Sequence, residues 1–296
     1  MASIREIQGR IKSIEDTKKI TNAMYLISST KLRKARKDQE NTSPYFTTVR
    51  QMIGRMFADL PELESPYVQK GEPKPSKKRG VLVITADKGL AGSYNHNVLK
   101  LALSHLEENE NPLLFVVGEV GRQYFRSRKI PVEQSFLYTA QNPTLDRARE
   151  IAGRLVEHYD NGDIDEIAIV YTRMKNSLAM ETEFARLLPL SKDTFEKPDD
   201  VPQTLSSHTF EPSPEAAIQS IIPNYLTGYI YGALVESFCC EQNARMMAMS
   251  AANDNAEEIL RDLNIQFNRV RQAIITQEIT EVIGGAKALK SKGDAT

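Results

Sequence analysis

The stretch 256-AEEILRDLNIQFNRVRQAI-274 places apolar residues at alternating spacings of four and three. These residues are Ala256, Leu260, Leu263, Phe267, Val270 and Ile274. Such a heptad pattern predicts a helix that winds around a partner helix. The helical pattern continues in both directions, from about Ser213 to Ala288, and a helix of about 75 residues would be roughly 110 Å long. We therefore expect a long shaft, which no ordinary globular domain requires.

The beginning of this long helix carries clear signals. Ser213 can cap the first free N–H groups, Pro214 suits the first helical position, and Glu215 favours the positive end of the helix dipole. The segment from Ile221 to Phe238 is apolar almost all round, so we expect it to pack against both the N-terminal helix and a globular domain. Because it contains Pro223, Asn224 and Glu236, it indicates a buried helix rather than a membrane span.

A second long helix is expected from Ser3 to about Phe57. Ser3 and Glu6 have the spacing of a capping box. The apolar stripe runs through Ile4, Ile7, Ile11 and Ile14, and then shifts to Ile20, Met24 and Ile27. Pro44 should kink this helix or divide it.

Between the two helices the pattern changes to strands that alternate with helices. We expect strands at 80–85, 113–117 and 166–172, a possible edge strand at 132–138 and a possible last strand at 183–190. The intervening helices are expected at 95–107, 121–128 and 145–159. This alternation predicts a Rossmann-like α/β domain, with a mainly parallel, doubly wound sheet and flanking helices. The predicted organisation is thus an N-terminal shaft helix (1–60), a linker (61–76), the α/β domain (77–197), a connector (198–212) and a C-terminal shaft helix (213–296).

Composition excludes several functions for the whole chain. Thirty-eight Lys and Arg residues against 39 Asp and Glu residues give a formal net charge of −1, which favours neither nucleic acid nor a membrane surface. The four histidines are scattered, so no metal site is expected. The N-terminus has no hydrophobic signal core. Adjacent Cys239 and Cys240 point in different directions on a helix, so a bridge between them is not expected, and a reducing compartment fits best.

A basic cluster on the N-terminal helix has three possible interpretations. It consists of Lys31, Arg33, Lys34, Arg36 and Lys37. A solvated helix face is the commonest reason for such a run. A nucleic-acid surface is the second, although the segment lacks interleaved aromatic residues. The third is electrostatic attraction to an acidic protein partner.

The turn after the first expected strand, 86-ADKGLAGSYN-95, is where related folds often bind phosphate. Neither G-x-G-x-x-G nor G-x-x-x-x-G-K-[ST] occurs, however, and Asp87 is better explained as a turn-forming residue. We find no convincing nucleophile–base or carboxylate pair, so no catalytic residue, metal site or cofactor is assigned. The alternative to a mechanical role is a small-ligand-binding α/β domain with a coiled-coil interaction arm.

The lengths of the two helices lead to a prediction about their ends. Both join the α/β domain, so they should run antiparallel from a shared base. The C-terminal helix is longer by about 20 residues and should extend about 30 Å beyond Met1. From about Arg269 its apolar residues would have no intrachain partner helix, which would promote aggregation in a monomer. We therefore expect another protein to enclose this end. Its apolar residues are Ile274, Ile275, Ile279, Val282 and Ile283.

Four segments carry a family resemblance over essentially the whole chain. They are 11-IKSIEDTKKITNAM-24 with 31-KLRKA-35, the turn 85-TADKGLAGSYN-95, 245-RMMAMSAANDNA-256 and 275-ITQEITEVIGGA-286. The last is highly specific, and together they resemble the gamma subunits of F-type ATP synthases. Ala91 replaces the cysteine frequent in the turn, and no insertion with paired cysteines is present, so no thiol function or redox switch is expected.

The resemblance implies a central rotor stalk that couples transmembrane ion flow to ATP synthesis or hydrolysis without an active site of its own. The implied partners are the alpha and beta subunits, the epsilon subunit and the membrane c-ring. It also implies a peripheral location at the cytoplasmic face of a bacterial plasma membrane. The implied contacts are Met24, Lys31, Arg33 and Lys34 with an acidic beta loop, Arg271 and Gln272 with a second beta loop, Gln277, Thr280 and Glu281 in the same upper region, and Phe210 and Glu211 near the rotor ring.

Overall fold

The computed structural model describes residues 3–60, 63, 65–69, 78–107, 112–176, 179–191, 194–195, 211 and 213–293, with side chains described up to residue 285. The chain forms two compact units. We call Met1–Ile27 with Met246–Thr296 the coiled-coil unit, and Ser28–Arg245 the α/β unit. The long helices α1 (Ile4–Asp59) and α5 (Pro214–Gly293) each contribute residues to both units.

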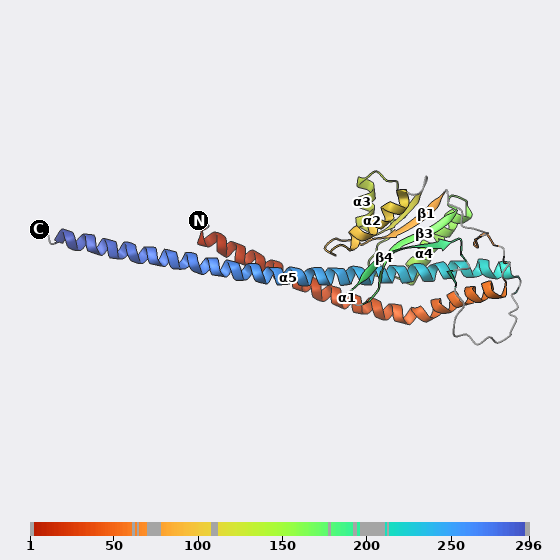
Figure 1. Cartoon of the computed structure of the whole chain (residues 1–296), viewed down its shortest axis with the longest axis horizontal. Coiled ribbons are helices and arrows are strands. Elements are labelled where there is room, and N and C mark those ends of the chain that lie inside the picture. The colour runs from red at the N-terminus through yellow and green to blue at the C-terminus, as the bar shows by residue number, and fades with distance from the viewer. Residues whose placement is uncertain are drawn as a thin grey trace. The chain divides into compact units, whose positions relative to one another are not determined.

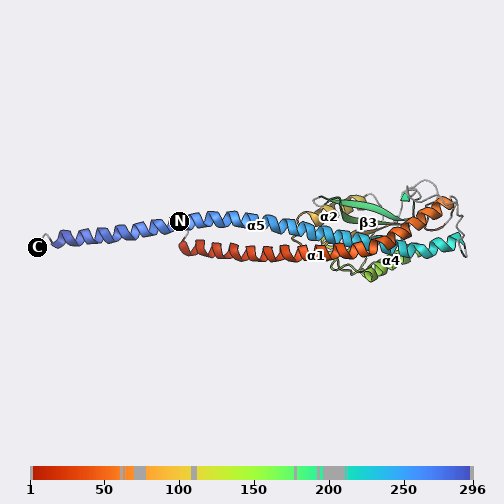
Figure 2. The same ribbon diagram turned by 90° about the horizontal axis from the view of Figure 1, so that it is seen from below.

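In the coiled-coil unit, α1 and α5 lie side by side and run antiparallel (Figures 1 and 2). The Lys18 Nζ lies 2.7 Å from the Glu257 Oε1, and the Thr21 hydroxyl donates to the Asn253 side-chain oxygen. These two pairs set the register of the helices, because residue numbers fall along α5 as they rise along the antiparallel α1. In this register Ile4 lies opposite about residue 270, so α5 continues alone beyond that point. The antiparallel coiled coil predicted from the sequence is confirmed.

The predicted shift of the apolar stripe on α1 is wrong. Ile20 and Ile27 are 61% and 55% exposed, whereas Thr21 and Ser28 are buried. The buried face therefore keeps a strict seven-residue spacing through Ile7, Thr21 and Ser28. Polar residues occupy heptad positions where an apolar residue would be expected, and the Thr21 hydroxyl is satisfied by α5.

Both long helices begin as expected. The Ser3 Oγ accepts from the Glu6 N–H at 3.3 Å, and the Ser213 Oγ accepts from the Ala216 N–H at 3.2 Å. Pro44 does not divide α1, which is one helix through that position. Proline removes only one backbone donor there, and close packing nearby can offset the loss. A Cβ built on Gly228 of α5 would lie 2.0 Å from the Cδ1 atom of Phe46, so this ring rests directly on the α5 backbone.

The α/β unit is built on a four-stranded sheet of order β2-β1-β3-β4. Strands β1 (Arg79–Ile84), β2 (Leu113–Val117) and β3 (Glu166–Met174) are parallel, and β4 (Met180–Leu188) pairs with β3 in the antiparallel direction. The central strands are continuous apolar runs because both faces of the sheet are covered. The predicted mainly parallel sheet is confirmed, and β4 begins three residues earlier than predicted.

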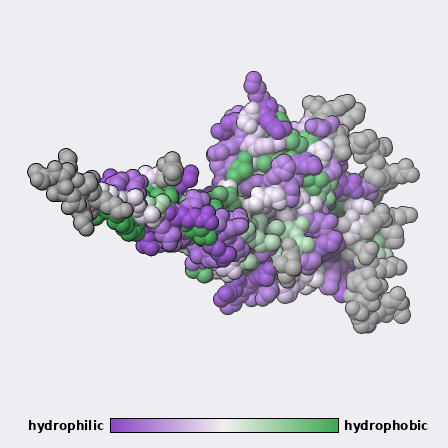
Figure 3. Space-filling model, turned by 60° about the vertical axis from the view of Figure 1, so that its left-hand side comes forward, coloured by the Kyte–Doolittle hydropathy of each residue, from purple (hydrophilic) through white to green (hydrophobic). Residues whose placement is uncertain are grey.

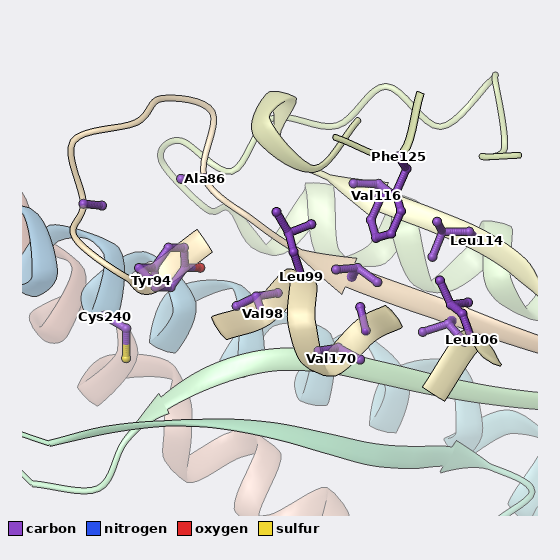
Figure 4. Packing of buried hydrophobic residues seen from close by; sticks show 14 of the residues in the cluster. Ala86, Tyr94, Val98, Leu99, Leu106, Leu114, Val116, Phe125, Val170 and Cys240 are labelled. Carbon is purple, nitrogen blue, oxygen red and sulfur yellow. The ribbon is translucent and has the colours of Figure 1, made fainter. Parts of the chain in front are cut away.

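Three helices flank this sheet: α2 (Tyr94–Glu107), α3 (Glu119–Ser127) and α4 (Leu145–Asp160). Alternate residues of β1 and β2 face α2 and α3 in one core cluster, which also reaches Cys240 of α5 (Figure 4). Ile151 and Leu155 of α4 are fully buried.

The predicted edge strand at 132–138 is wrong. This segment follows β2 with isolated hydrogen bonds, from the Glu133 N–H to the Leu114 carbonyl at 2.8 Å and from the Gly118 N–H to the Tyr138 carbonyl at 3.1 Å. Between them the chain turns, because the Phe136 N–H bonds back to the Glu133 carbonyl. The Glu133 carboxylate accepts from the Ser135 hydroxyl and stabilises this turn, so no ladder can form.

The apolar part of α5 packs on two sides, as predicted. The Thr172 N–H of β3 donates to the Ser237 hydroxyl at 3.2 Å, and the rings of Tyr231 and Phe46 lie 6.3 Å apart between α5 and α1. Cys239 and Cys240 are buried free thiols, and burial raises the pKa of both, to about 11 for Cys239. Their reactivity is therefore low. The five-part division of the chain stays a prediction, and most of the linker and connector lie outside the described residues.

Candidate functional site

The most unusual surface is the part of α5 that has no partner helix among the residues that the structure describes. Every residue from Arg271 to Gly285 is exposed. We call this segment the α5 end. Figure 3 shows hydrophobic residues next to polar ones along the coiled-coil unit. The apolar side chains of the α5 end, which are 40–72% exposed, are Ile274, Ile275, Ile279, Val282 and Ile283.

The polar residues predicted for contact lie on this same segment. The Gln277 amide donates to the Glu281 carboxylate at 2.9 Å. The Thr280 hydroxyl donates to the Thr276 carbonyl of its own helix at 2.7 Å. Arg271 and Gln272 are exposed. The structure thus brings five predicted contact residues together on one unpaired helix, beside the apolar side chains.

The basic face of α1 is only partly available to a partner. Arg33 and Lys34 are exposed, but Lys31 is half-buried and its Nζ donates to the Gln141 Oε1 at 3.0 Å. These three residues lie in the α/β unit, whereas Met24 is half-buried in the coiled-coil unit. Glu211 is exposed, and Phe210 lies outside the described residues.

In the turn after β1, side chains bind backbone groups of neighbouring segments. The Asp87 carboxylate accepts from the N–H groups of Ala140 at 3.0 Å, Gln141 at 3.1 Å and Glu119 at 3.2 Å, and from the Thr139 hydroxyl. It therefore caps the N-terminus of α3 with the chain's own negative charge, at a kind of position where related folds bind phosphate. The interpretation of Asp87 as a turn-forming residue holds.

Two other residues of the motif also bind backbone. The Asn95 side chain accepts from the Ala86 N–H at 2.9 Å, and the Thr85 hydroxyl bonds with the Val117 carbonyl and the Gly121 N–H at 3.0 Å. Gly118 has φ of 95°, and a Cβ there would lie 2.2 Å from the Thr85 carbonyl oxygen. The motif thus specifies a local structure rather than a ligand site.

Sequence reasoning missed a buried charged pair on α5. Glu241 and Arg245 are 1% and 7% exposed, and the Arg245 Nη2 lies 2.8 Å from the Glu241 Oε1. Burial raises the pKa of Glu241, which the neighbouring guanidinium opposes. The sequence offered one signal for this pair, a spacing of four residues between opposite charges at the end of an apolar run. That spacing is also common on exposed helix faces, so it did not indicate burial.

Among the described residues, no cluster of three or more His, Cys, Asp or Glu side chains has a metal-binding arrangement. Within the same residues, no helix is both long and apolar enough to span a membrane.

A paired coiled coil, an unpaired apolar helix end and an α/β unit define a stalk-type protein. The family model described as ATP synthase matches residues 3–289. The chain is 42% identical to the ATP synthase gamma chain of Acetivibrio thermocellus over 98% of this chain and 100% of that one. It is 38% identical to the sodium-ion-specific gamma chain of Acetobacterium woodii, over 97% and 99%. The chain therefore belongs to the ATP synthase gamma chain family, and the resemblance inferred from its motifs is confirmed.

Solved structures agree with this assignment. The central stalk and c-ring structure of the Tetrahymena thermophila mitochondrial ATP synthase matches with a TM-score of 0.58 at 25% identity, over 79% of this chain and 99% of that one. The rotor of the Euglena gracilis enzyme has the same fold, with a TM-score of 0.64 at 15% identity over 92% and 98%. Family members are non-catalytic stalk subunits, so this chain is a peripheral, membrane-associated part of an ATP synthase complex.

Proposed function

We propose that this chain is the rotating central stalk that transmits ion-driven rotation to the nucleotide sites of an alpha–beta hexamer. The observation that carries the proposal is the uninterrupted exposure of the α5 end. Five large apolar side chains on one bare helix would be unfavourable in water, since each stabilises by roughly 1.5–3 kcal/mol when fully buried. A surrounding ring of partner subunits would cover them on all sides of the helix.

The exposure of the polar residues on the α5 end and of Arg33 and Lys34 on α1 supports the two predicted beta contacts. Arg271 and Gln272 lie at the start of the α5 end, and Gln277, Thr280 and Glu281 lie further along it. In this proposal they meet one beta loop and the surrounding upper region. Met24, Lys31, Arg33 and Lys34 meet a second, acidic beta loop. Arg33 and Lys34 supply most of the attraction, because Lys31 already donates to Gln141.

Rotation can change the nucleotide sites because the stalk is asymmetric. To switch a site from mostly one state to mostly another, a contact must favour one state by about 5 kcal/mol. A helix whose cationic, amide and apolar residues are unevenly distributed around its axis presents different contacts to each beta subunit as it turns. The chain itself then needs no catalytic group.

We propose that the α/β unit contacts the epsilon subunit and the c-ring, with Phe210 and Glu211 near the ring. We further propose the cytoplasmic face of a bacterial plasma membrane as the location, since the relatives named above with about 40% identity are bacterial. The alternative of a small-ligand-binding α/β domain is disfavoured, because Asp87, Thr85 and Asn95 are already engaged with backbone.

The test is to make the α5 end polar without shortening it. Ile275, Ile279 and Val282 are replaced together by serine in the complete complex, reconstituted in vesicles. The matched control replaces exposed Gln266 and Asn268 by serine on the same helix. We expect the triple variant to lose most ion-driven ATP synthesis per assembled complex and the control to keep it. Equal synthesis by the triple variant and the control would contradict the proposal.

A further inference from the structure

The turn after β1 is held from α5 by one buried guanidinium. The Arg245 Nη2 donates to the carbonyl oxygens of Lys88 at 3.3 Å and Gly89 at 3.1 Å. The same nitrogen lies 2.8 Å from the Glu241 carboxylate, one helical turn earlier. A buried arginine fixed by a carboxylate has little freedom to follow other partners, so these bonds hold the turn in one position relative to α5.

The same turn is held from α1 through a second route. The Lys31 Nζ donates to the Gln141 Oε1, and the Gln141 N–H donates to the Asp87 carboxylate at 3.1 Å. Asp87 immediately precedes the carbonyls that Arg245 binds. A continuous polar connection therefore runs from α1 through Gln141 and the turn to α5. We call the connection formed by Lys31, Gln141, Asp87, Arg245 and Glu241 the polar joint.

The backbone of the turn is strained, and the polar joint is one of the features that hold it. Leu90 has φ of 63°, a left-handed conformation that costs a non-glycine residue free energy. Its side chain is 65% exposed, so burial of that side chain does not impose the conformation. The bonds to Asp87, Lys88 and Gly89 on the preceding residues and the burial of Ala91 on the following one hold this conformation.

The neighbouring apolar contacts are poorly suited to resist twisting. Where α5 meets the core cluster it contributes the small side chains of Cys240 and Ala244, and Cys240 lies near Tyr94 in Figure 4. Apolar contacts are non-directional and depend mainly on buried area, whereas hydrogen bonds weaken steeply when their angles change. Near this turn, directional bonds therefore add a resistance to rotation of α5 against the sheet that these small side chains cannot supply.

We infer that Arg245 and Gln141 are positioning residues that lock the turn after β1 to α1 and α5 within the α/β unit, so that torque passes between the sheet and the helices, an inference that rests on the proposed stalk function. The polar joint matters most when rotation works against a load. Without it the turn yields and part of each rotation is lost as slippage. ATP hydrolysis continues, because the contacts of the α5 end with the hexamer are intact.

The experiment measures ions transported per ATP hydrolysed by the complete complex in vesicles, against increasing opposing ion gradients. One variant is the double change Glu241→Gln with Arg245→Gln, which leaves no unpaired buried charge. A second is Gln141→Leu, which cuts the connection to α1 and leaves Arg245 unchanged. The matched control is Arg149→Gln on α4, whose guanidinium is mostly exposed and pairs with Asp146.

Both variants should transport as wild type does without a gradient. Under the largest gradient that the wild type sustains, we expect the number of ions transported per ATP hydrolysed to fall about fivefold or more in both variants. A change of about fivefold is the lower range of coupling between linked sites. Arg245→Lys, which keeps one cationic donor, should give an intermediate loss. A merely structural defect would lower hydrolysis and transport together at every gradient, and that result would overturn the inference. A ratio equal to that of the Arg149→Gln control at every gradient would also overturn it.

If the double variant fails to assemble, the Gln141→Leu result decides. Failure of the wild-type chain to couple hydrolysis to transport would instead contradict the proposed function itself. Normal coupling by the wild type with normal coupling by the variants would reject only the role of the polar joint.

Discussion

Two glycines of α5, four residues apart, offer a sharp test of how closely the two long helices pack in the α/β unit. A Cβ built on Gly228 would lie 2.0, 2.5 and 2.7 Å from three atoms of the Phe46 ring. A Cβ built on Gly232 would have no neighbour within 4 Å. We therefore expect Gly228→Ala to destabilise the chain and Gly232→Ala to stabilise it.

The magnitudes follow from two opposing effects. Alanine in a helix interior is more favourable than glycine by about 1 kcal/mol, and this gain applies at both positions. At Gly228 the ring of Phe46 must move by about 1.5 Å to reach an ordinary contact distance, and overpacking of this kind costs about 1–3 kcal/mol. Taking the upper part of that range, because the overlap is severe, the net loss for Gly228→Ala is about 1–2 kcal/mol. The two chemically identical substitutions should then differ by about 2–3 kcal/mol.

The assay is denaturant unfolding of the full chain followed by circular dichroism, with the free energy of unfolding compared among variants. A Phe46→Ala background provides the internal control, because without the ring Gly228→Ala should stabilise as much as Gly232→Ala does. If both alanine variants shift the free energy of unfolding in the same direction in the wild-type background, Phe46 does not rest on α5 as described.

Two further predictions concern charge. Reversal of Arg33 and Lys34 to glutamate should lower the crosslinking yield to an acidic beta loop, most strongly at low salt where screening is weak. The control Lys100→Glu, at an exposed position of α2, should leave the yield unchanged. An unaltered yield in the Arg33 and Lys34 variant would contradict the basic-face contact. Burial raises the pKa of Tyr225 to about 12, and burial with a hydrogen bond to Asp160 raises that of Tyr67 to about 12, against about 10 when unfolded. Because the pKa values in the folded chain are the higher ones, the contribution of these two tyrosines to stability should be complete below about pH 10 and lost as the pH rises towards about 12. Denaturant midpoints and phenolate absorbance measured over this pH range test the prediction. Ionisation of both tyrosines near pH 10 in the folded chain would refute it.

The sequence predicted the long-range architecture well because that architecture depends on periodicity. The heptad pattern of α5 is strongly apolar from Ala256 to Val270, and these residues are buried or half-buried in the structure. The unpaired end was predictable from helix lengths alone. Apolar periodicity failed to predict the buried face of α1, because Thr21 and Ser28 take the buried positions and Ile20 stays exposed. Periodicity of apolar residues cannot detect a seam in which hydrogen bonding replaces hydrophobic contact.

The polar joint could not be predicted for a different reason. Arg245 binds the carbonyl of a residue 156 positions earlier, and Lys31 binds a residue 110 positions later. No local pattern encodes such pairs, which exist only after α5 has packed against the turn. The segment at 132–138 shows the converse error, since its strand-like composition was overruled by the local turn that Glu133 and Ser135 form.

The two parts of the molecule use different kinds of contact, and each kind suits its proposed task. The α5 end offers apolar side chains, whose interactions depend on covered area and not on exact bond angles. A partner surface can therefore enclose that end while the helix turns inside it. The polar joint offers directional bonds between a buried guanidinium and backbone carbonyls, which tolerate little rotation before they break. A stalk that must exchange its contacts with one partner as it turns, and stay fixed to another, needs non-directional contacts in the first place and directional contacts in the second. The distribution of Ile279, Val282 and Arg245 meets both requirements.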